Sequence, residues 1–132
     1  MEEIKEKLEL IKKYLTDNFK CEAIVLFGSY SRNTQNAESD IDIAIKLKEK
    51  IGAKQLFYAK NELEDITNKD IDLIDLDNIQ DGIRYEILIN GITLYVEDEL
   101  KFELYKLDMY REYLELNEAR QIIIDNIKKG GN

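Results

Sequence analysis

Residues 28–42, which read GSYSRNTQNAESDID, decide the fold of this chain. They follow a purely apolar run, residues 23–27 (AIVLF), and lead into residues 41–47 (IDIAIKL), where apolar side chains occupy every second position. An apolar run that is bounded by turn residues and followed by a segment of period two is typical of two neighbouring strands. The stretch therefore predicts a buried strand, a Gly-Ser turn, a loop and a second strand.

Asp40 and Asp42 lie two residues apart at the start of the second predicted strand. Because successive side chains of a strand point to opposite faces, the two carboxylates share a face and stand roughly 6.6 Å apart along the chain. Mg²⁺ is commonly bound by one or two carboxylates together with substrate phosphates, so the pair can act as a metal platform. The alternative is that both acids form the solvated side of an amphipathic edge strand.

Gly28 and Ser29 supply the other half of such a site. Glycine allows the backbone to approach a ligand closely, and exposed amides with a serine hydroxyl can bind phosphate oxygens. Because this turn directly follows an apolar strand and precedes the acidic pair by ten residues, the combination favours a phosphate and metal site over a solvated strand.

The string Gly28-Ser29 followed by Asp40-Ile41-Asp42 resembles the hallmark of the nucleotidyltransferase superfamily that includes DNA polymerase beta. The fuller pattern, residues 28–32 and 38–43, is similar to the minimal branch of that superfamily (MNT). Members of this branch are small single-domain proteins, and many are antitoxins paired with HEPN-type ribonuclease toxins. The resemblance covers about residues 20–96. It implies a nucleoside triphosphate, two Mg²⁺ ions and transfer of a nucleoside monophosphate.

The remaining pattern predicts helices and two further strands around this motif. We expect helices over about residues 3–18, 53–67, 79–90 and 97–129, and strands over about 70–76 and 92–96. The fold class is then α/β (α+β), with a small mixed sheet of about four strands flanked by helices and a long C-terminal helix. The resemblance implies the polymerase-beta-type nucleotidyltransferase fold. The length of 132 residues fits a single domain, residues 1–132, whose core covers about residues 20–96.

Some details of these helices are also predicted. The helical period places Ile66 and Ile83 on inward faces, and Gly91 is expected to end its helix in the left-handed conformation. A break in the last helix is expected near residues 116–117. That helix either packs on its own sheet or presents tyrosines such as Tyr110 and Tyr113 to a partner.

A third carboxylate on a neighbouring strand, facing the acidic pair, is implied by the resemblance. We expect it to be Asp72, because it lies within the apolar run of residues 70–76, where an acid is costly to desolvate unless it is paired or metal-bound. Asp70 lies on the same face and is the competing choice. Asp75 lies on the opposite face and is expected to matter little.

By resemblance, Asp40, Asp42 and Asp72 would be the catalytic metal ligands for two Mg²⁺ ions. Gly28 and Ser29 would hold the β- and γ-phosphates of ATP. Arg32 would neutralise phosphate charge, although a surface salt bridge with Glu38 is a comparable interpretation.

Composition limits the chemistry further. The chain has no histidine, so any general base must be a carboxylate, and the single Cys21 rules out an internal disulfide. The net charge of −9 argues against direct nucleic-acid binding and favours a basic protein partner. The acidic start and the lack of a long apolar run predict a cytoplasmic protein that does not contact a membrane.

The resemblance implies that this nucleotidyltransferase is an antitoxin. It would transfer AMP from ATP to a tyrosine hydroxyl of a cognate HEPN ribonuclease toxin, with which it would form a hetero-oligomer. One alternative is a small-molecule adenylyltransferase like those that modify aminoglycosides, whose additional substrate domain is missing here. Another is a binding antitoxin that blocks its partner without catalysis, and the complete motif with three carboxylates argues against it.

Overall fold

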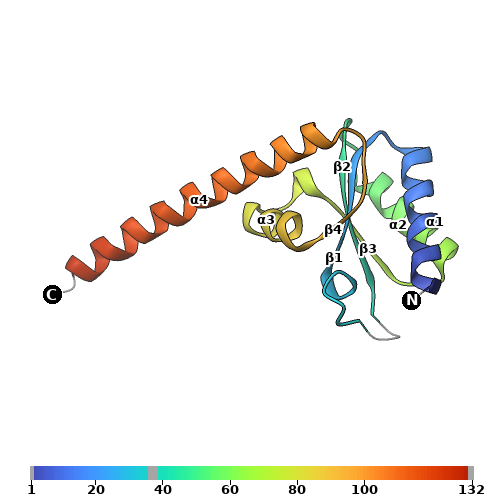
Figure 1. The fold of residues 1–132 in the computed structure, drawn as a ribbon, viewed down its shortest axis with the longest axis horizontal. Coiled ribbons are helices and arrows are strands. Elements are labelled where there is room, and N and C mark those ends of the chain that lie inside the picture. Colours follow the sequence, from blue (N-terminus) through green and yellow to red (C-terminus); the bar gives the residue numbers. More distant parts are fainter. Residues whose placement is uncertain (1, 36–38, 131–132) are drawn as a thin grey trace.

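The computed structural model of the chain describes residues 2–35 and 39–130. Over these residues the fold has four strands, four α-helices and two short 3-10 helices (Figure 1). In chain order they are α1 (Glu2–Asn18), β1 (Cys21–Phe27), η1 (Gly28–Tyr30), β2 (Ile41–Leu47), α2 (Ala53–Thr67), β3 (Ile71–Asp75), η2 (Leu76–Asn78), α3 (Asp81–Asn90), β4 (Ile92–Val96) and α4 (Glu99–Gly130). The predicted elements are confirmed: α2, β2 and β4 have the predicted bounds, and the bounds of the others differ by at most two residues.

The sheet has the strand order β3-β2-β1-β4. Strands β2 and β3 are parallel, whereas β1 is antiparallel to both β2 and β4. Because a parallel pair needs a crossover connection, helix α2 carries the chain from β2 to β3. The predicted mixed sheet is confirmed. Strand β2 lies inside the sheet, so Asp40 and Asp42 do not belong to an amphipathic edge strand.

Both faces of the sheet are buried. Ile41, Ile43 and Ile45 pack with helices α1 and α2, and Ile11 and Leu15 of α1 are fully buried against them. Ala44 points to the other face, where it packs with Ile87 and Leu88 of α3 and Phe102 of α4. The sheet is thus the middle layer between two pairs of helices (Figure 1). The strand residues alternate between two apolar clusters, and polar side chains are left at the two ends of the strands.

Three details of the predicted helices are wrong. Ile66 and Ile83 were expected to face inward but are 44% and 50% exposed, because Thr67 and Ile87 occupy the buried positions of their helices. Gly91 is not left-handed, since its φ is −76°. A Cβ atom at Gly91 would instead meet Val25 Cγ1 and the Ile87 carbonyl oxygen at 2.5 Å. Glycine is needed there because the end of α3 packs directly on β1.

Helix α4 runs without a break through residues 99–130, so the break that the sequence suggested near residue 116 is absent. Its first turns pack on the sheet through Phe102, Tyr105 and Met109. Two of its tyrosines stack on Tyr85 of α3: the Tyr113 ring with ring centroids 3.9 Å apart, and the Tyr110 ring, which is 40% exposed, with ring centroids 5.8 Å apart. Beyond these contacts α4 projects away from the body of the molecule (Figure 1).

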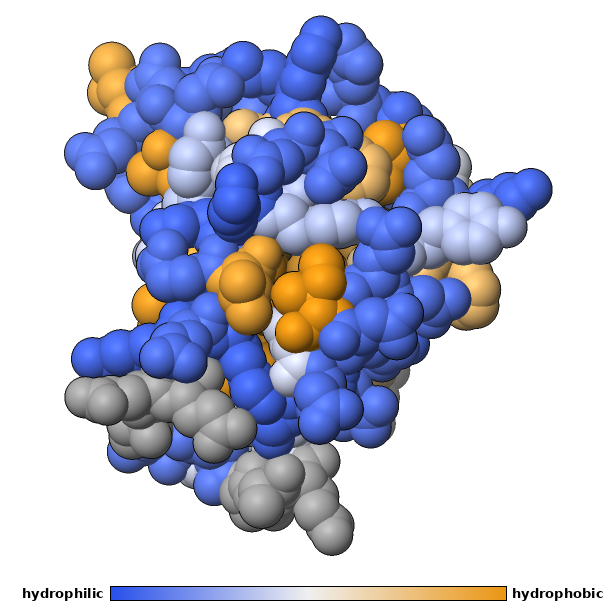
Figure 2. Space-filling model, turned by 90° about the vertical axis from the view of Figure 1, so that its right-hand side faces the viewer, coloured by the Kyte–Doolittle hydropathy of each residue, from blue (hydrophilic) through white to orange (hydrophobic). Residues whose placement is uncertain are grey.

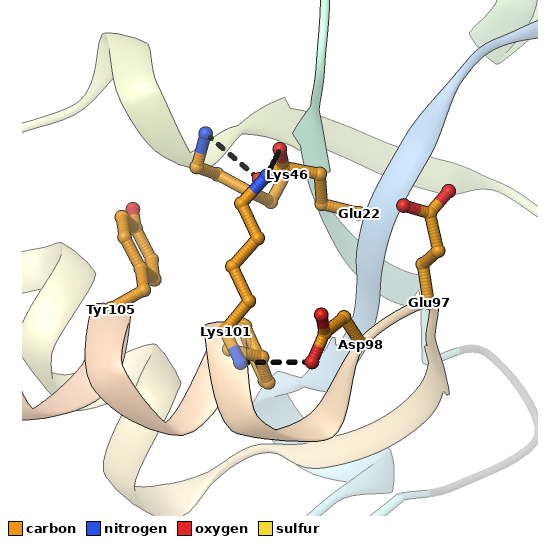
Figure 3. A pocket seen from close by; sticks show the side chains of 7 residues that line it. Glu22, Lys46, Glu97, Asp98, Lys101 and Tyr105 are labelled. Carbon is orange, nitrogen blue, oxygen red and sulfur yellow. Dashed lines mark hydrogen bonds and ion pairs between the residues drawn. The ribbon is translucent and has the colours of Figure 1, made fainter.

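A network of ion pairs fixes the start of α4 to the sheet (Figure 3). Lys46 of β2 lies 2.9 Å from Asp77 and 3.4 Å from Glu22, and Lys101 of α4 lies 2.9 Å from the same Glu22. Burial alone would lower the pKa of Lys46, but the neighbouring Asp77 and Glu22 outweigh it and raise that pKa. Lys46 also lies 5.4 Å from the ring centre of Tyr105. Glu22, Lys46 and Lys101 line a cavity of about 230 Å³ together with Tyr105.

The face covered by α1 and α2 is mainly hydrophilic, and its apolar patches are small and surrounded by polar side chains (Figure 2). Exposed apolar residues are more numerous on α4, where ten large ones are at least 40% exposed: Leu100, Leu104, Leu107, Tyr110, Leu114, Leu116, Ile122, Ile123, Ile124 and Ile127. Within the described residues, no helix is both long and apolar enough to span a membrane.

Candidate active site

The acidic residues meet at one end of the sheet because of the strand register. Asp42 of β2 is paired with Asp72 of β3, and the preceding pair is Ile41 with Ile71. In a parallel pair, residues in register point to the same face, so the carboxylates of Asp42 and Asp72 are neighbours. Asp40 immediately precedes β2 and lies on the same face as Asp42. The structure therefore brings together the three carboxylates that the sequence analysis selected.

Asp72 is exposed, so the argument that led to it from the cost of desolvation was wrong. The buried acid of β3 is Asp75, which is 8% exposed and accepts a 3.0 Å hydrogen bond from the amide of Asp77 at the start of η2. Asp75 lies on the opposite face, as predicted, and stabilises a turn. Register with Asp42 is the observation that distinguishes Asp72, since Asp70 lies before β3 and contacts β2 through its carbonyl oxygen, 3.0 Å from the Ile41 amide.

Asp42 occupies an electrostatically unfavourable position. Burial, followed by the charges of Asp72 and Asp40, raises the pKa of Asp42 from 3.8 to about 6, and Arg32 opposes this rise. Two carboxylates beside a partly buried third disfavour its ionised form, and a bound cation would relieve the repulsion. The same interactions show that Arg32 lies close to the acidic group.

Gly28 is held against Asp42 by the register of β1 and β2, in which Phe27 pairs with Asp42. Its φ is +72°, a conformation that L residues with a side chain rarely adopt. A Cβ atom at this position would overlap the Asp42 carboxylate. Glycine is therefore required both by the turn and by the approach of the backbone to the acidic group.

The turn after Gly28 uses its carbonyl groups internally. The Gly28 oxygen accepts hydrogen bonds from the Ser31 and Arg32 amides at 3.2 and 3.3 Å, and the Ser29 oxygen accepts one from the Thr34 amide at 3.0 Å. Among residues 2–35 and 39–130, nothing hydrogen-bonds the Ser29 hydroxyl. This hydroxyl is available to a ligand. The alternative interpretation of Arg32, a surface salt bridge with Glu38, involves a residue that lies outside the described residues.

The residues fit a divalent metal ion that is shared with a phosphate group. Across the described parts of the chain, no three acidic side chains converge tightly enough to enclose one ion by themselves. Mg²⁺ commonly takes one or two carboxylates and completes its shell with water and substrate phosphates, so a complete protein cage is not needed. Asp42 has a raised pKa because Asp40 and Asp72 lie close to it, and Asp42 with either neighbour offers the two carboxylates of such a shell.

Two features near this site were missed in the sequence. Lys69 donates a 2.9 Å hydrogen bond to the Tyr30 hydroxyl and so ties the Gly-Ser turn to the start of β3. Helix α3 also borders the turn, where Ile83, Glu86 and Asn90 line a cavity together with Gly28. No local pattern reveals these neighbours. The apolar spacing of α3 was read as an inward face, and only the packing of Gly91 on β1 brings the helix beside the turn.

Comparison with known proteins agrees with this geometry. The family model described as Polymerase beta, Nucleotidyltransferase matches residues 9–100. The protein adenylyltransferase MntA of Shewanella oneidensis is 32% identical over 120 residues, which cover 89% of this chain and 84% of that protein.

Two solved structures share the fold over nearly the whole chain. A crystal structure of a toxin–antitoxin complex with AMP-PNP matches with a TM-score of 0.81 and 31% identity, covering 91% of this chain and 97% of that one. The complex of a tri-AMPylated Shewanella oneidensis HEPN toxin with its MNT antitoxin matches with a TM-score of 0.76 and 28% identity, covering 93% and 97%. The predicted polymerase-beta-type fold is confirmed. The chain therefore belongs to the polymerase beta nucleotidyltransferase family and is a nucleotidyltransferase related to the MntA protein adenylyltransferases.

Proposed function

We propose that this chain transfers AMP from ATP to a tyrosine hydroxyl of a cognate HEPN-type toxin and thereby acts as its antitoxin. One observation carries the proposal: Gly28 touches the Asp42 carboxylate, and Asp42 is in register with Asp72. This close approach supports a site in which the Gly-Ser turn binds phosphate beside a set of carboxylates. The relatives that share the fold are a protein adenylyltransferase and antitoxins in complex with their toxins, one of which is AMPylated.

Each residue has a defined part in this reaction. The Ser29 hydroxyl and the backbone of Gly28 would hold the β- and γ-phosphates, and Arg32 would neutralise part of their charge. Asp40, Asp42 and Asp72 would hold two Mg²⁺ ions, which supply charge neutralisation and polarise the acceptor hydroxyl. The acceptor oxygen forms a bond to the α-phosphorus, the bond to the β-phosphate oxygen breaks, and pyrophosphate leaves. The hydroxyl proton passes to Asp72 or to water.

The reaction needs positioning more than a protein nucleophile, which suits a chain without histidine and with a buried Cys21. Burial raises the pKa of the Cys21 thiol to about 11, so it stays protonated and unreactive at neutral pH. We place the reaction in the cytoplasm, where ATP and Mg²⁺ are supplied.

Recognition of the toxin is assigned to helix α4. Its first half is fixed to the sheet by Phe102 and the Lys101–Glu22 ion pair, and its second half extends away from the body (Figure 1). Exposed leucines such as Leu107 and Leu114 offer apolar area, and apolar patches with aromatic anchors are typical of protein interfaces.

The test uses the purified chain, its HEPN partner, ATP and Mg²⁺. The expected result is that the intact mass of the partner increases by whole adenylyl groups and that its ribonuclease activity falls. Asp42→Asn should form the same complex without the mass increase, because helix α4 is unchanged. An unmodified partner in the presence of a folded, ATP-binding wild-type chain would contradict the proposal. If that partner is nevertheless inhibited, the chain is a binding antitoxin.

A further inference from the structure

The segment that enters strand β3 is bonded to three different parts of the molecule at three consecutive residues. These hydrogen bonds run from Lys69 Nζ to the Tyr30 hydroxyl at 2.9 Å, from the Ile41 amide to the Asp70 carbonyl oxygen at 3.0 Å, and from the Ile71 amide to Glu64 Oε2 of α2 at 3.0 Å. We propose that Lys69 and Tyr30 are positioning residues for AMP transfer, which hold the Gly-Ser turn in place relative to Asp72. This proposal rests on the proposed function and adds two residues to it that bind neither phosphate nor metal.

The Lys69–Tyr30 bond joins two parts of the site that the sheet does not pair directly. In the strand order β3-β2-β1-β4, strand β2 lies between β1 and β3. Tyr30 ends the turn η1 that follows β1, and Lys69 lies two residues before β3. The bond therefore crosses the start of β2 and links the turn that would hold the phosphates to the strand that carries Asp72.

The other hydrogen bonds of the turn do not fix its distance from β3. The pairing of β1 with β2 ends at Phe27 and Asp42. Beyond this pair the turn keeps its own shape, because the Gly28 carbonyl oxygen accepts hydrogen bonds from the Ser31 and Arg32 amides. Those bonds are internal to the turn. The Lys69–Tyr30 bond attaches the turn, as a unit, to the entrance of β3.

The surroundings of Tyr30 indicate that its hydroxyl has a part of its own. The ring packs against the apolar cluster beneath α1 and α2, where a phenylalanine ring would fill the same space. The hydroxyl accepts a hydrogen bond from an ammonium group, and such charge-assisted bonds are stronger than bonds between neutral groups. The Lys69 ammonium also lies 5.6 Å from the centre of the ring. Packing alone therefore does not account for the hydroxyl.

Lys69 differs in its part from Arg32, a cation of the turn itself. The described charges that shift the pKa of Asp42 are those of Asp72, Asp40 and Arg32. Lys69 therefore acts through Tyr30 and not as a counter-ion of the central carboxylate. Misplacing reacting groups by about 1 Å can lower a rate about 100-fold, so a bond that holds the turn and Asp72 in place affects the rate without touching the substrate.

The test measures AMP transfer to the HEPN partner by intact mass, at saturating ATP, Mg²⁺ and partner. We expect Tyr30→Phe, which keeps the ring, and Lys69→Met, which removes the charged donor, each to lower kcat about fivefold, the size of one hydrogen bond. Affinity for AMP-PNP with Mg²⁺, measured by calorimetry, should change by less than about twofold, because the turn keeps its shape. Lys69→Arg keeps a charged donor and should retain most of the rate.

A double variant and a matched pair elsewhere in the chain complete the design. If Tyr30 and Lys69 act through one bond, the variant with both Tyr30→Phe and Lys69→Met should be no slower than the slower single variant. The control is the Lys54–Tyr58 pair near the start of α2, whose ammonium lies 5.9 Å from the ring centre. Lys54→Met and Tyr58→Phe should leave kcat unchanged. Circular dichroism melting would establish that each variant is folded.

The outcomes separate this proposal from the proposed function. Wild-type kcat in Tyr30→Phe and Lys69→Met would overturn the positioning role and leave the proposed function standing. A loss of rate that merely follows a lower melting temperature would assign the pair to stability and overturn that role as well. If Lys69→Met only raises the concentration of partner that is needed, Lys69 is a contact for the toxin and the proposal fails. A folded wild-type chain that binds AMP-PNP but transfers no AMP would overturn the proposed function and the positioning role together.

Discussion

Asp42→Asn should stabilise the metal-free chain above pH 6, although it removes the central metal ligand. The folded chain raises the pKa of Asp42 from 3.8 to about 6, first through burial and then through Asp72 and Asp40. The folded state therefore holds this proton more tightly than the unfolded state, and stability falls as pH rises from about 4 to 6. An asparagine side chain carries no charge, so the variant does not lose this stability.

The size of the effect follows from the pKa difference. A difference of this size corresponds to about 3 kcal/mol, and screening by water at a partly exposed carboxylate reduces it to about 1–2 kcal/mol. At pH 4 both proteins carry an uncharged side chain at this position, so the stability difference should nearly vanish. The measurement is urea unfolding with EDTA at pH 4 and pH 8.

The control is Asp70→Asn, which removes an exposed carboxylate of the same segment and should change stability by less than about 0.5 kcal/mol. Adding Mg²⁺ with AMP-PNP should reverse the order at pH 8, because the wild-type chain gains binding energy that the variant lacks. A variant that is less stable than the wild-type chain at pH 8, or equally stabilised at pH 4 and pH 8, would refute the electrostatic reasoning.

Three further predictions test other parts of the site and of α4. Asp72→Asn should abolish AMP transfer in a mass-spectrometric assay while Asp70→Asn retains most of it, since only Asp72 is in register with the acidic pair; the reverse result would show that the third ligand is misplaced. Gly28→Ala should lower stability by at least about 1 kcal/mol and abolish transfer, because its φ is +72° and its Cβ would displace a carboxylate; a fully active variant would contradict the close approach. Tyr110→Ala should weaken toxin binding by about 1 kcal/mol and lower the melting temperature less than Tyr113→Ala does, because the exposed Tyr110 ring lies 5.8 Å from the centre of the Tyr85 ring, whereas the Tyr113 ring stacks on it at 3.9 Å; equal melting of both variants would count against this distinction.

The sheet and its acidic end could be predicted from local sequence. The apolar run of residues 23–27 and the strict alternation of residues 41–47 fix two strands, and period two alone places Asp40 and Asp42 on one face. The pairing of Asp42 with Asp72 depends on the register of two strands joined by a helix of 15 residues. Local pattern contains no information on that register.

The errors share a physical cause, since helical periodicity identifies an apolar face but does not show what covers it. Ile83 belongs to the apolar series of α3, yet Ile87 and Leu88 occupy the buried positions of that helix and Ile83 lies beside the Gly-Ser turn. Gly91 was assigned a left-handed conformation because glycine often ends helices that way. Its actual role, close packing on β1, depends on a strand more than 60 residues earlier and leaves no trace in the neighbouring sequence.

The charged side chains at the two ends of strand β2 differ in their neighbours: one is paired with opposite charges, and the other lies beside like charges. Lys46, at one end, lies within 3.4 Å of two carboxylates, and one of them, Glu22, also pairs with Lys101 of α4. Asp42, four residues earlier on the same face, has two carboxylates beside it, and Arg32 opposes them as a positive charge. A protein that needed this end only for stability would gain by pairing or removing Asp42. The folded chain keeps the electrostatic repulsion at Asp42, and a divalent cation with a bound nucleotide would offset this repulsion.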